Sequence, residues 1–279
     1  MSRLAASALG AGLTASLSEI LRSTLPAGTP RWTRSNFRGN QVSLTGGLST
    51  AAGAVASAAG AGGRAGAAAV VTAGTAGVLG ALDDRETDSV DKGLRGHVRA
   101  LAQGRLTTGG AKLLGISGAA LIGAMIGTAA GRRGSGPAPG RLARGGDVLT
   151  SAALIAGTAN LLNLFDLRPG RALKVAGALS LGPALGRSPG APLATGALAV
   201  AAASWHTDLT EETMLGDAGA NALGALVGTA LALHPSAGLR TGVLAGVVGL
   251  TLLSEKVSFS RVIESVPALR ALDTWGRSG

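Results

Sequence analysis

The chain has 279 residues, of which 46% are hydrophobic, 14% charged and 2% aromatic, and it carries a net charge of +10. The absence of cysteine excludes disulfide bonds and thiolate metal sites, and the three histidines are scattered without zinc-binding spacing. The basic residues lie in short loops between apolar runs, and aromatic residues that could stack on bases are few, so the charge does not indicate nucleic-acid binding.

The high glycine content points to helices that pack closely. The chain contains 46 glycines and has a mean hydropathy of +0.37. Both values fit an integral membrane protein, because small residues let helices approach where lipid removes the usual hydrophobic drive. A soluble, low-complexity Ala/Gly-rich chain is the alternative, and the regular recurrence of the apolar runs argues against it.

Nine apolar stretches predict an all-α polytopic membrane protein, with a single transmembrane domain over residues 1–254. Several stretches are shorter than the ~20 residues of a perpendicular span, so the count could be eight or ten. The first stretch could instead be a signal peptide, since Arg3 precedes it. The predicted spans cover residues 4–21, 45–63, 65–82, 112–130, 147–164, 172–186, 190–204, 218–233 and 238–254.

Lysine and arginine predict the orientation of these spans. The loops 22–44, 83–111, 165–171 and 205–217 and the tail 255–279, with the flanking Lys112 and Lys174, hold 17 of the 25 Lys and Arg residues. This excess places them in the cytoplasm and the N-terminus outside, although Arg132, Arg133, Arg141 and Arg144 form a basic cluster on the other side. We therefore expect a multi-pass plasma-membrane protein with a cytoplasmic functional face. The tail is predicted to be an amphipathic helix on the inner membrane surface, with Trp275 near the interface.

Three acidic clusters lie at the predicted cytoplasmic ends of the spans. The first is Asp83-Asp84, which taken alone indicates a solvated helix end more than a site. The second is Asn160, Asn163 and Asp166, which share roughly one helix face and could also bond between helices. The third is Asp217 with Asn221, where Asp217 could simply be the N-cap of the next helix. Carboxylates beside basic loops suit Mg²⁺ and a diphosphate, because the metal would bridge phosphate oxygens while Lys and Arg balance the remaining charge.

Four segments in this order resemble the polyprenyl-phosphate N-acetylhexosamine-1-phosphate transferases. The segment 34–40 followed by Leu44-Thr45-Gly46-Gly47-Leu48 looks like the first cytoplasmic loop of that family and the Gly-Gly element after it. Asp83-Asp84 resembles its Asp-Asp motif, and Asn160 to Asp166 resembles its Asn-x-x-Asn-x-x-Asp motif. Leu215-Gly216-Asp217-Ala218-Gly219 resembles its Met-Gly-Asp-x-Gly motif. The resemblance covers roughly residues 30 to 260.

The resemblance implies transfer of a sugar-1-phosphate from a UDP-sugar to a polyprenyl phosphate, with Mg²⁺ as cofactor and UMP as product. Asp217 would be the Mg²⁺ ligand, and Asp83, Asp84 and Asp166 would be catalytic. The substrates would be bound by Asn160, Asn163, Lys112, Arg38 and Asn221, although Lys112 could equally be a snorkelling interface residue. The partners would be these two substrates and membrane lipid, and a homodimer is left open.

The chain departs from the family pattern at three places. After Asp166 the family continues Asp-Gly-(Leu/Ile)-Asp-Gly-Leu, whereas this chain has Asp166-Leu167-Arg168-Pro169-Gly170-Arg171. Residues 254–261 replace a His-rich motif, and a final spanning helix is missing. These departures leave two other hypotheses: an inactive member of the family that binds lipid phosphate or nucleotide sugar, and a small membrane transporter whose polar residues line a path.

Overall fold

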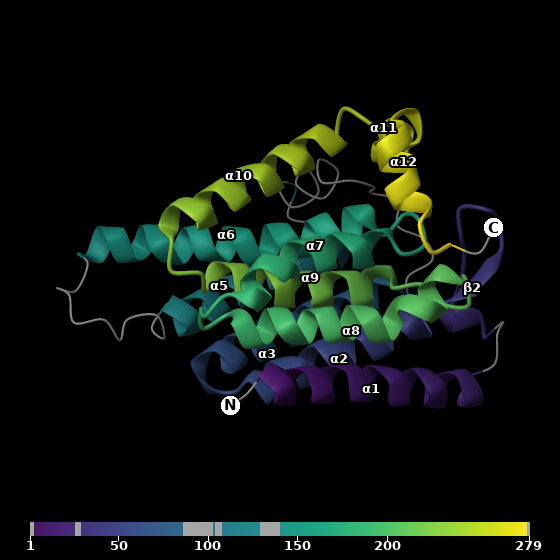
Figure 1. Ribbon diagram of the computed structural model, residues 1–279, viewed down its shortest axis with the longest axis horizontal. Coiled ribbons are helices and arrows are strands. Elements are labelled where there is room, and N and C mark those ends of the chain that lie inside the picture. The colour runs from purple at the N-terminus through teal and green to yellow at the C-terminus, as the bar shows by residue number, and fades with distance from the viewer. Residues whose placement is uncertain (1–2, 26–28, 86–102, 104–107, 129–139, 278–279) are drawn as a thin grey trace.

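The computed structural model describes residues 3–25, 29–85, 103, 108–128 and 140–277, and this part is dominated by eleven α-helices (Figure 1). The helices are α1 (Arg3–Thr24), α2 (Thr45–Ala61), α3 (Gly63–Asp83), α5 (Thr108–Thr128), α6 (Arg141–Phe165), α7 (Arg171–Leu185), α8 (Ala191–Leu209), α9 (Gly216–Ala232), α10 (Ala237–Ser254), α11 (Phe259–Ser265) and α12 (Pro267–Thr274). A 3-10 turn, η1 (Pro30–Trp32), precedes the strands β1 (Thr33–Ser35) and β2 (Gln41–Ser43). The predicted all-α class is confirmed, and each of the nine predicted apolar stretches coincides with one helix.

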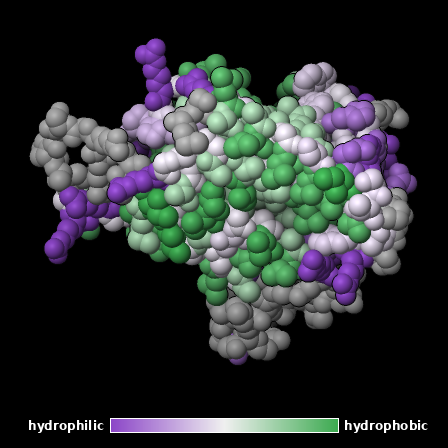
Figure 2. Space-filling model, turned by 90° about the horizontal axis from the view of Figure 1, so that it is seen from below, coloured by the Kyte–Doolittle hydropathy of each residue, from purple (hydrophilic) through white to green (hydrophobic). Residues whose placement is uncertain are grey.

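Five of the described helices are long and apolar enough to cross a membrane: α1, α3, α5, α6 and α10. Figure 2 shows a broad apolar band across the middle of one face, with hydrophilic residues gathered toward both ends. The helices α2, α7 and α9 have only 17, 15 and 17 residues, which is short for a perpendicular span. The protein is thus described as a membrane protein with five candidate spans, and the count of nine spans stays a prediction.

Helix α9 forms the centre of the bundle. Every residue from Ala218 to Ala232 is buried, and the helix packs against α2, α3, α6 and α8 (Figure 1). Glycine allows this close packing: a Cβ added at Gly224 would lie 2.7 Å from the Cα of Ala159, and one at Gly228 would lie 2.8 Å from the Cα of Ile155. Close backbone contact between helices is the expected use of small residues in a membrane protein. Because α9 is enclosed by protein, its N-terminus is held in a fixed position.

The C-terminal end of α3 and the segments that follow α1, α6, α8 and α10 meet at one end of the bundle (Figure 1). The antiparallel strands β1 and β2 pair Arg34 with Val42, and Ser43 of β2 forms a bridge with Thr213 just before α9. At the opposite end the described connections α2–α3, α7–α8 and α9–α10 are short turns, and the first of them uses Gly62 at a φ of 67°. Most of the predicted loop 83–111, together with Arg132 and Arg133, lies outside the described residues.

The C-terminal tail differs from the single amphipathic helix that we predicted. It forms α11 and α12, which are separated at Val266 because Pro267 begins the second helix. The side chain of Asp273 is buried against the bundle, and the Trp275 ring lies 5.5 Å from that of Trp205. The apolar side chains of the tail, such as Leu272, are exposed. The tail therefore docks on the protein through polar side chains and aromatic rings, while its aliphatic side chains such as Leu272 face outward.

Candidate functional site

The three acidic clusters converge on one cavity of about 430 Å³ at the polar end of the bundle. It is formed by the ends of α3 and α6, the start of α9 and the strand β1. Its lining includes Arg34, Ser35, Leu44, Asp83, Asp84, Asn163, Asp166, Leu167, Met214, Gly216 and Asp217. Four carboxylates from three distant segments of the sequence therefore share one cavity.

Asp84 caps the N-terminus of α9. Its Oδ1 accepts the amide of Asp217 and its Oδ2 accepts the amide of Ala218, each at 2.9 Å. The possible N-cap role of Asp217 is thus filled by a residue from α3, and Asp217 lies in the first turn of α9. Burial raises the pKa of Asp84 above its ordinary value, and the two amides only partly offset this effect.

Lys112 connects two of the predicted site carboxylates. Its Nζ lies 3.0 Å from Oδ2 of Asp83 and 2.5 Å from Oδ2 of Asp217. The three side chains are 14%, 28% and 24% exposed, respectively, so water screens this contact only in part. The predicted phosphate-binding Lys112 is therefore at the site, where it neutralises the carboxylates.

Asp166 lies at the C-terminal end of α6, where its carboxylate accepts the amide of Gly216. Burial raises its pKa well above the ordinary value, and the nearby charges of Asp208, Asp217 and Asp84 raise it further. Asn163 lines the same cavity, one helical turn before. These two members of the predicted Asn-x-x-Asn-x-x-Asp motif therefore meet the other clusters.

Three other predicted substrate-binding residues do not line this cavity. Asn160 is exposed on α6. Asn221 is buried, and its side-chain amide donates to the backbone oxygen of Asp217 in its own helix at 2.7 Å. Arg38 is exposed and forms an ion pair with Glu211 at 3.5 Å. Asn221 therefore supports the first turns of α9, while Asn160 and Arg38 lie outside the cavity.

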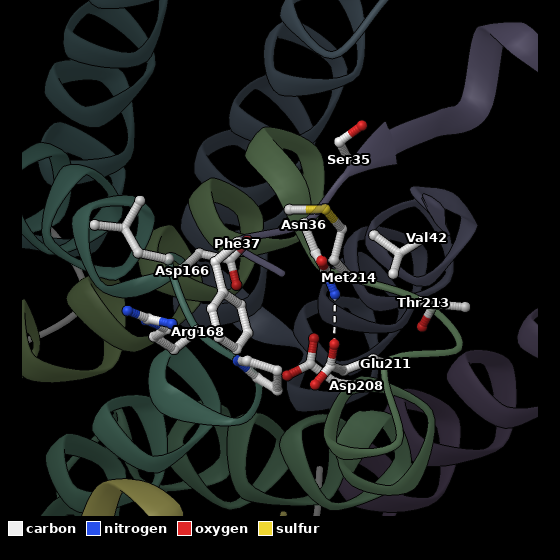
Figure 3. A pocket seen from close by; sticks show the side chains of 12 residues that line it. Ser35, Asn36, Phe37, Val42, Asp166, Arg168, Asp208, Glu211, Thr213 and Met214 are labelled. Carbon is white, nitrogen blue, oxygen red and sulfur yellow. Dashed lines mark hydrogen bonds between the residues drawn. The ribbon is translucent and has the colours of Figure 1, made fainter. Parts of the chain in front are cut away.

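A second cavity of about 290 Å³ adjoins the first and shares Ser35, Asp166, Leu167 and Met214 with it (Figure 3). In Figure 3, Asp208 and Glu211 lie close together on one side, and the Asn36 side-chain amide donates to Glu211. On the other side the Arg168 guanidinium lies 3.9 Å from the centre of the Phe37 ring. Such a cation–π contact holds a charged group at the cavity wall.

Asp208 is a site residue that we did not predict from the sequence. It is 5% exposed, and its Oδ2 accepts the amide of Gly170 at 2.6 Å. The same side chain also accepts the amide of Leu215, so it joins the segment after Asp166 to the segment before Asp217. Asp208 belongs to no motif, and the one signal for it is a carboxylate four residues after a predicted span.

The C-terminal tail holds the segment that follows Asp166. Arg171 forms a buried pair with Asp273 (Nε–Oδ1, 2.7 Å; Nη2–Oδ2, 2.9 Å), and the two side chains are 4% and 9% exposed. Arg277 donates to the backbone oxygen of Pro169 at 2.9 Å. The Phe165 and Phe259 rings stack with their centres 5.0 Å apart. The tail therefore forms a clasp over residues 165–171 rather than a free anchor.

The donor set of the larger cavity fits a hard divalent cation such as Mg²⁺, because its acidic and amide side chains offer oxygen. Asp217, Asp83 and Asp166 are the residues that would hold the ion, and it would share Asp83 and Asp217 with Lys112. Within the described part of the chain, no group of three or more His, Cys, Asp or Glu side chains is already arranged around a metal position. The donor atoms are thus suited to Mg²⁺, and the side chains would have to move closer together to coordinate it.

Neither a protein-family model nor a curated protein sequence matches this chain. The side chains of the site therefore indicate its chemistry. Carboxylates that can take up a cation, together with Lys112 and Arg34, suit a phosphorylated ligand. The adjoining cavity offers carboxylates and an aromatic ring, which suit a polar and partly planar ligand.

Proposed function

We propose that this protein is a membrane transferase that moves a sugar-1-phosphate of the N-acetylhexosamine type from a UDP-sugar to a polyprenyl phosphate. The reaction yields a polyprenyl-diphosphate-sugar for a cell-envelope polymer and releases UMP. The observation that carries the proposal is the convergence of Asp83, Asp84, Asn163, Asp166 and Asp217 on one cavity. Each comes from a motif that resembles the transferase family. The five candidate spans support the proposal, because a membrane protein has access to a lipid substrate.

In the proposed reaction an oxygen of the polyprenyl phosphate attacks the β-phosphorus of the UDP-sugar. A new bond forms between this oxygen and the β-phosphorus. The bond from the β-phosphorus to the oxygen that bridges the two phosphates of the UDP-sugar breaks, and UMP leaves with that oxygen and the electron pair. A phosphate oxygen is already anionic near neutral pH, so positioning and charge neutralisation dominate over base catalysis. Bound Mg²⁺ would supply positive charge to the diphosphate. Lys112 would hold Asp83 and Asp217 in place and offer its own charge to phosphate oxygens.

The first test compares Asp217→Asn with the unchanged protein in detergent or liposomes. We expect Mg²⁺-dependent UMP release to fall by at least about 100-fold, because the variant loses the charge that would hold the cation. The matched control is Glu19→Gln, which neutralises a carboxylate exposed on α1 and should leave UMP release unchanged. Thermal unfolding of both variants shows whether they fold. Undiminished release by a folded Asp217→Asn variant would falsify the assignment of the site.

A second candidate function is binding without turnover, by a protein that holds lipid phosphate or nucleotide sugar. The position of Lys112 favours it, because this cation already neutralises Asp83 and Asp217 where a metal would bind. Binding of a UDP-sugar measured by calorimetry, with no UMP from any donor in a panel of UDP-N-acetylhexosamines, would support this alternative. Metal-dependent UMP release with one donor would exclude it.

A further inference from the structure

A third cavity, of about 400 Å³, lies at the opposite end of α9 from the acidic site. It is formed where α5 and α9 end and where α6 and α10 begin. The charged side chains in its lining are Arg144, Asp147 and Arg240, and His234 lines it too. The residues of this cavity belong to none of the motifs discussed above, and its charge is opposite in sign to that of the carboxylate-lined cavity.

The two arginines of this cavity have unused hydrogen-bonding capacity. Arg240 is 12% exposed, and its terminal nitrogens contact Asp147 and the backbone oxygen of His234. The Nε atoms of Arg144 and Arg240 are buried and have no hydrogen-bond partner among the described residues. No ion pair of Arg144 is found in that part of the chain either. A buried donor without a partner is unfavourable, so these atoms indicate a missing acceptor.

The placement of the arginines also indicates an anion. Arg141 and Arg144 lie in the first turn of α6, and Arg240 lies in the first turn of α10. Neither first turn contains an acidic residue. The N-terminus of a helix carries partial positive charge and repels cations, so arginines there are unfavourable unless an anion neutralises them. Asp147 can neutralise only one of the two arginines that line the cavity.

We propose that this cavity binds a phosphate group, held by the guanidinium groups of Arg144 and Arg240 at the start of α6 and α10. Phosphate matches the forked donors of arginine and the free amides of a helix N-terminus. Both α6 and α10 are candidate spans, so the cavity lies at the level of lipid headgroups. The phosphate could belong to an anionic phospholipid or be free in solution. This site is independent of the proposed transferase activity.

The experiment measures thermal unfolding of the full chain in detergent with three probes: phosphatidylglycerol, diacylglycerol as the phosphate-free lipid, and inorganic phosphate. Stabilisation by phosphatidylglycerol but not by diacylglycerol identifies a headgroup site. Stabilisation by inorganic phosphate alone identifies a solute site. Either result supports the proposal when Arg144→Gln weakens the binding of that probe by about tenfold or more. The matched control is Arg187→Gln, which removes an exposed arginine at the same end of the bundle and should bind as the unchanged protein does.

A second variant tests the sign of the effect. Asp147→Asn removes the carboxylate that competes for Arg240, so the binding of the phosphate probe should strengthen. Asp147→Asn keeps both arginines, so this variant remains informative if an arginine variant fails to fold. The proposal is overturned if neither phosphate probe stabilises the protein, if Arg144→Gln binds as tightly as the Arg187→Gln control, or if Asp147→Asn weakens the binding.

Discussion

The charge of the larger cavity depends on the pH at which Asp84 and Asp166 ionise. Burial raises the pKa of both carboxyl groups above the ordinary value of 3.8. When the pKa in the folded chain exceeds that in the unfolded chain, the folded protein takes up the proton first as the pH falls. The stability that such a group contributes is therefore present at low pH and is lost as the pH rises through the raised pKa. The folded protein is thus less stable when these carboxyl groups are ionised than when they are protonated, and a bound cation would offset this difference.

This titration predicts a pH dependence for the cavity. We expect Mg²⁺-dependent UMP release to decline on acidification at a pH above the ordinary 3.8 of an aspartate, because protonated carboxyls do not hold the cation. In the metal-free protein, the contribution of the site carboxyls to the free energy of unfolding should increase as the pH falls, and thermal unfolding at several pH values measures this. Asp166→Asn should make the stability depend less on pH. If the variant and the unchanged protein have parallel stability profiles, the raised pKa of Asp166 is not supported.

Gly80 is a single residue on which the geometry of the site depends. A Cβ at this position of α3 would overlap the backbone of Asp217 and Ala218, which cannot move as a side chain could. We expect Gly80→Ala to lower the free energy of unfolding by about 1–3 kcal/mol through overpacking. The control is Gly118→Ala on α5, where no atom lies within 4 Å and the change should be neutral or stabilising. Equal thermal midpoints for the two variants would contradict the close contact of α3 with α9.

At the scale of elements, the clasp formed by α11 and α12 determines how firmly residues 165–171 are held. Asp273→Asn leaves the buried Arg171 without a charged partner, which typically costs about 3 kcal/mol or more. We expect faster amide hydrogen exchange in residues 165–171 and easier proteolysis of the tail. Burial alone would raise the pKa of Asp273, but hydrogen bonds and charges from Arg171 and Arg277 lower it overall. The clasp should therefore remain ionised under mildly acidic conditions.

The matched control for the clasp is Glu264→Gln. This residue pairs with Arg168 at 3.0 Å, but its side chain is 56% exposed, so the pair should contribute less than about 1 kcal/mol. Amide exchange in residues 165–171 should then remain close to that of the unchanged protein. If Asp273→Asn and Glu264→Gln have the same effect on exchange, the buried pair has no special role in holding the segment.

For the whole molecule, the orientation in the membrane is a separate prediction. The chain has no cysteine, so one introduced cysteine gives a clean signal. Ser265→Cys lies on the tail at the acidic end, and Ala237→Cys lies at the arginine-lined end; both positions are exposed. A membrane-impermeant maleimide should label Ser265→Cys from the cytoplasmic side and Ala237→Cys from the opposite side. Labelling of both positions from one side would contradict the orientation predicted from Lys and Arg.

The sequence predicted the helices better than it predicted the site. Within the described residues all nine apolar stretches coincide with helices, because a helix satisfies its own backbone hydrogen bonds in apolar surroundings. The motif residues Asp83, Asp84, Asn163, Asp166 and Asp217 do meet in one cavity. Asp208 and the Arg171–Asp273 pair could not be predicted, because they depend on contacts between segments whose spacing in the sequence follows no local period. The same applies to the docking of the tail, which uses buried ion pairs and ring contacts with distant segments.

The clasp also has a consequence for biosynthesis. Asp273 follows Arg171 by 102 residues, so it is translated only after α8, α9 and α10. Until Asp273 is translated, the segment that carries Asp166 has no clasp, although Asp84 and Asp217 can meet once α9 is in place. The acidic cavity is therefore completed late, when the bundle is in place. A nascent chain would be inserted with the carboxylates of this cavity not yet fixed in their final arrangement.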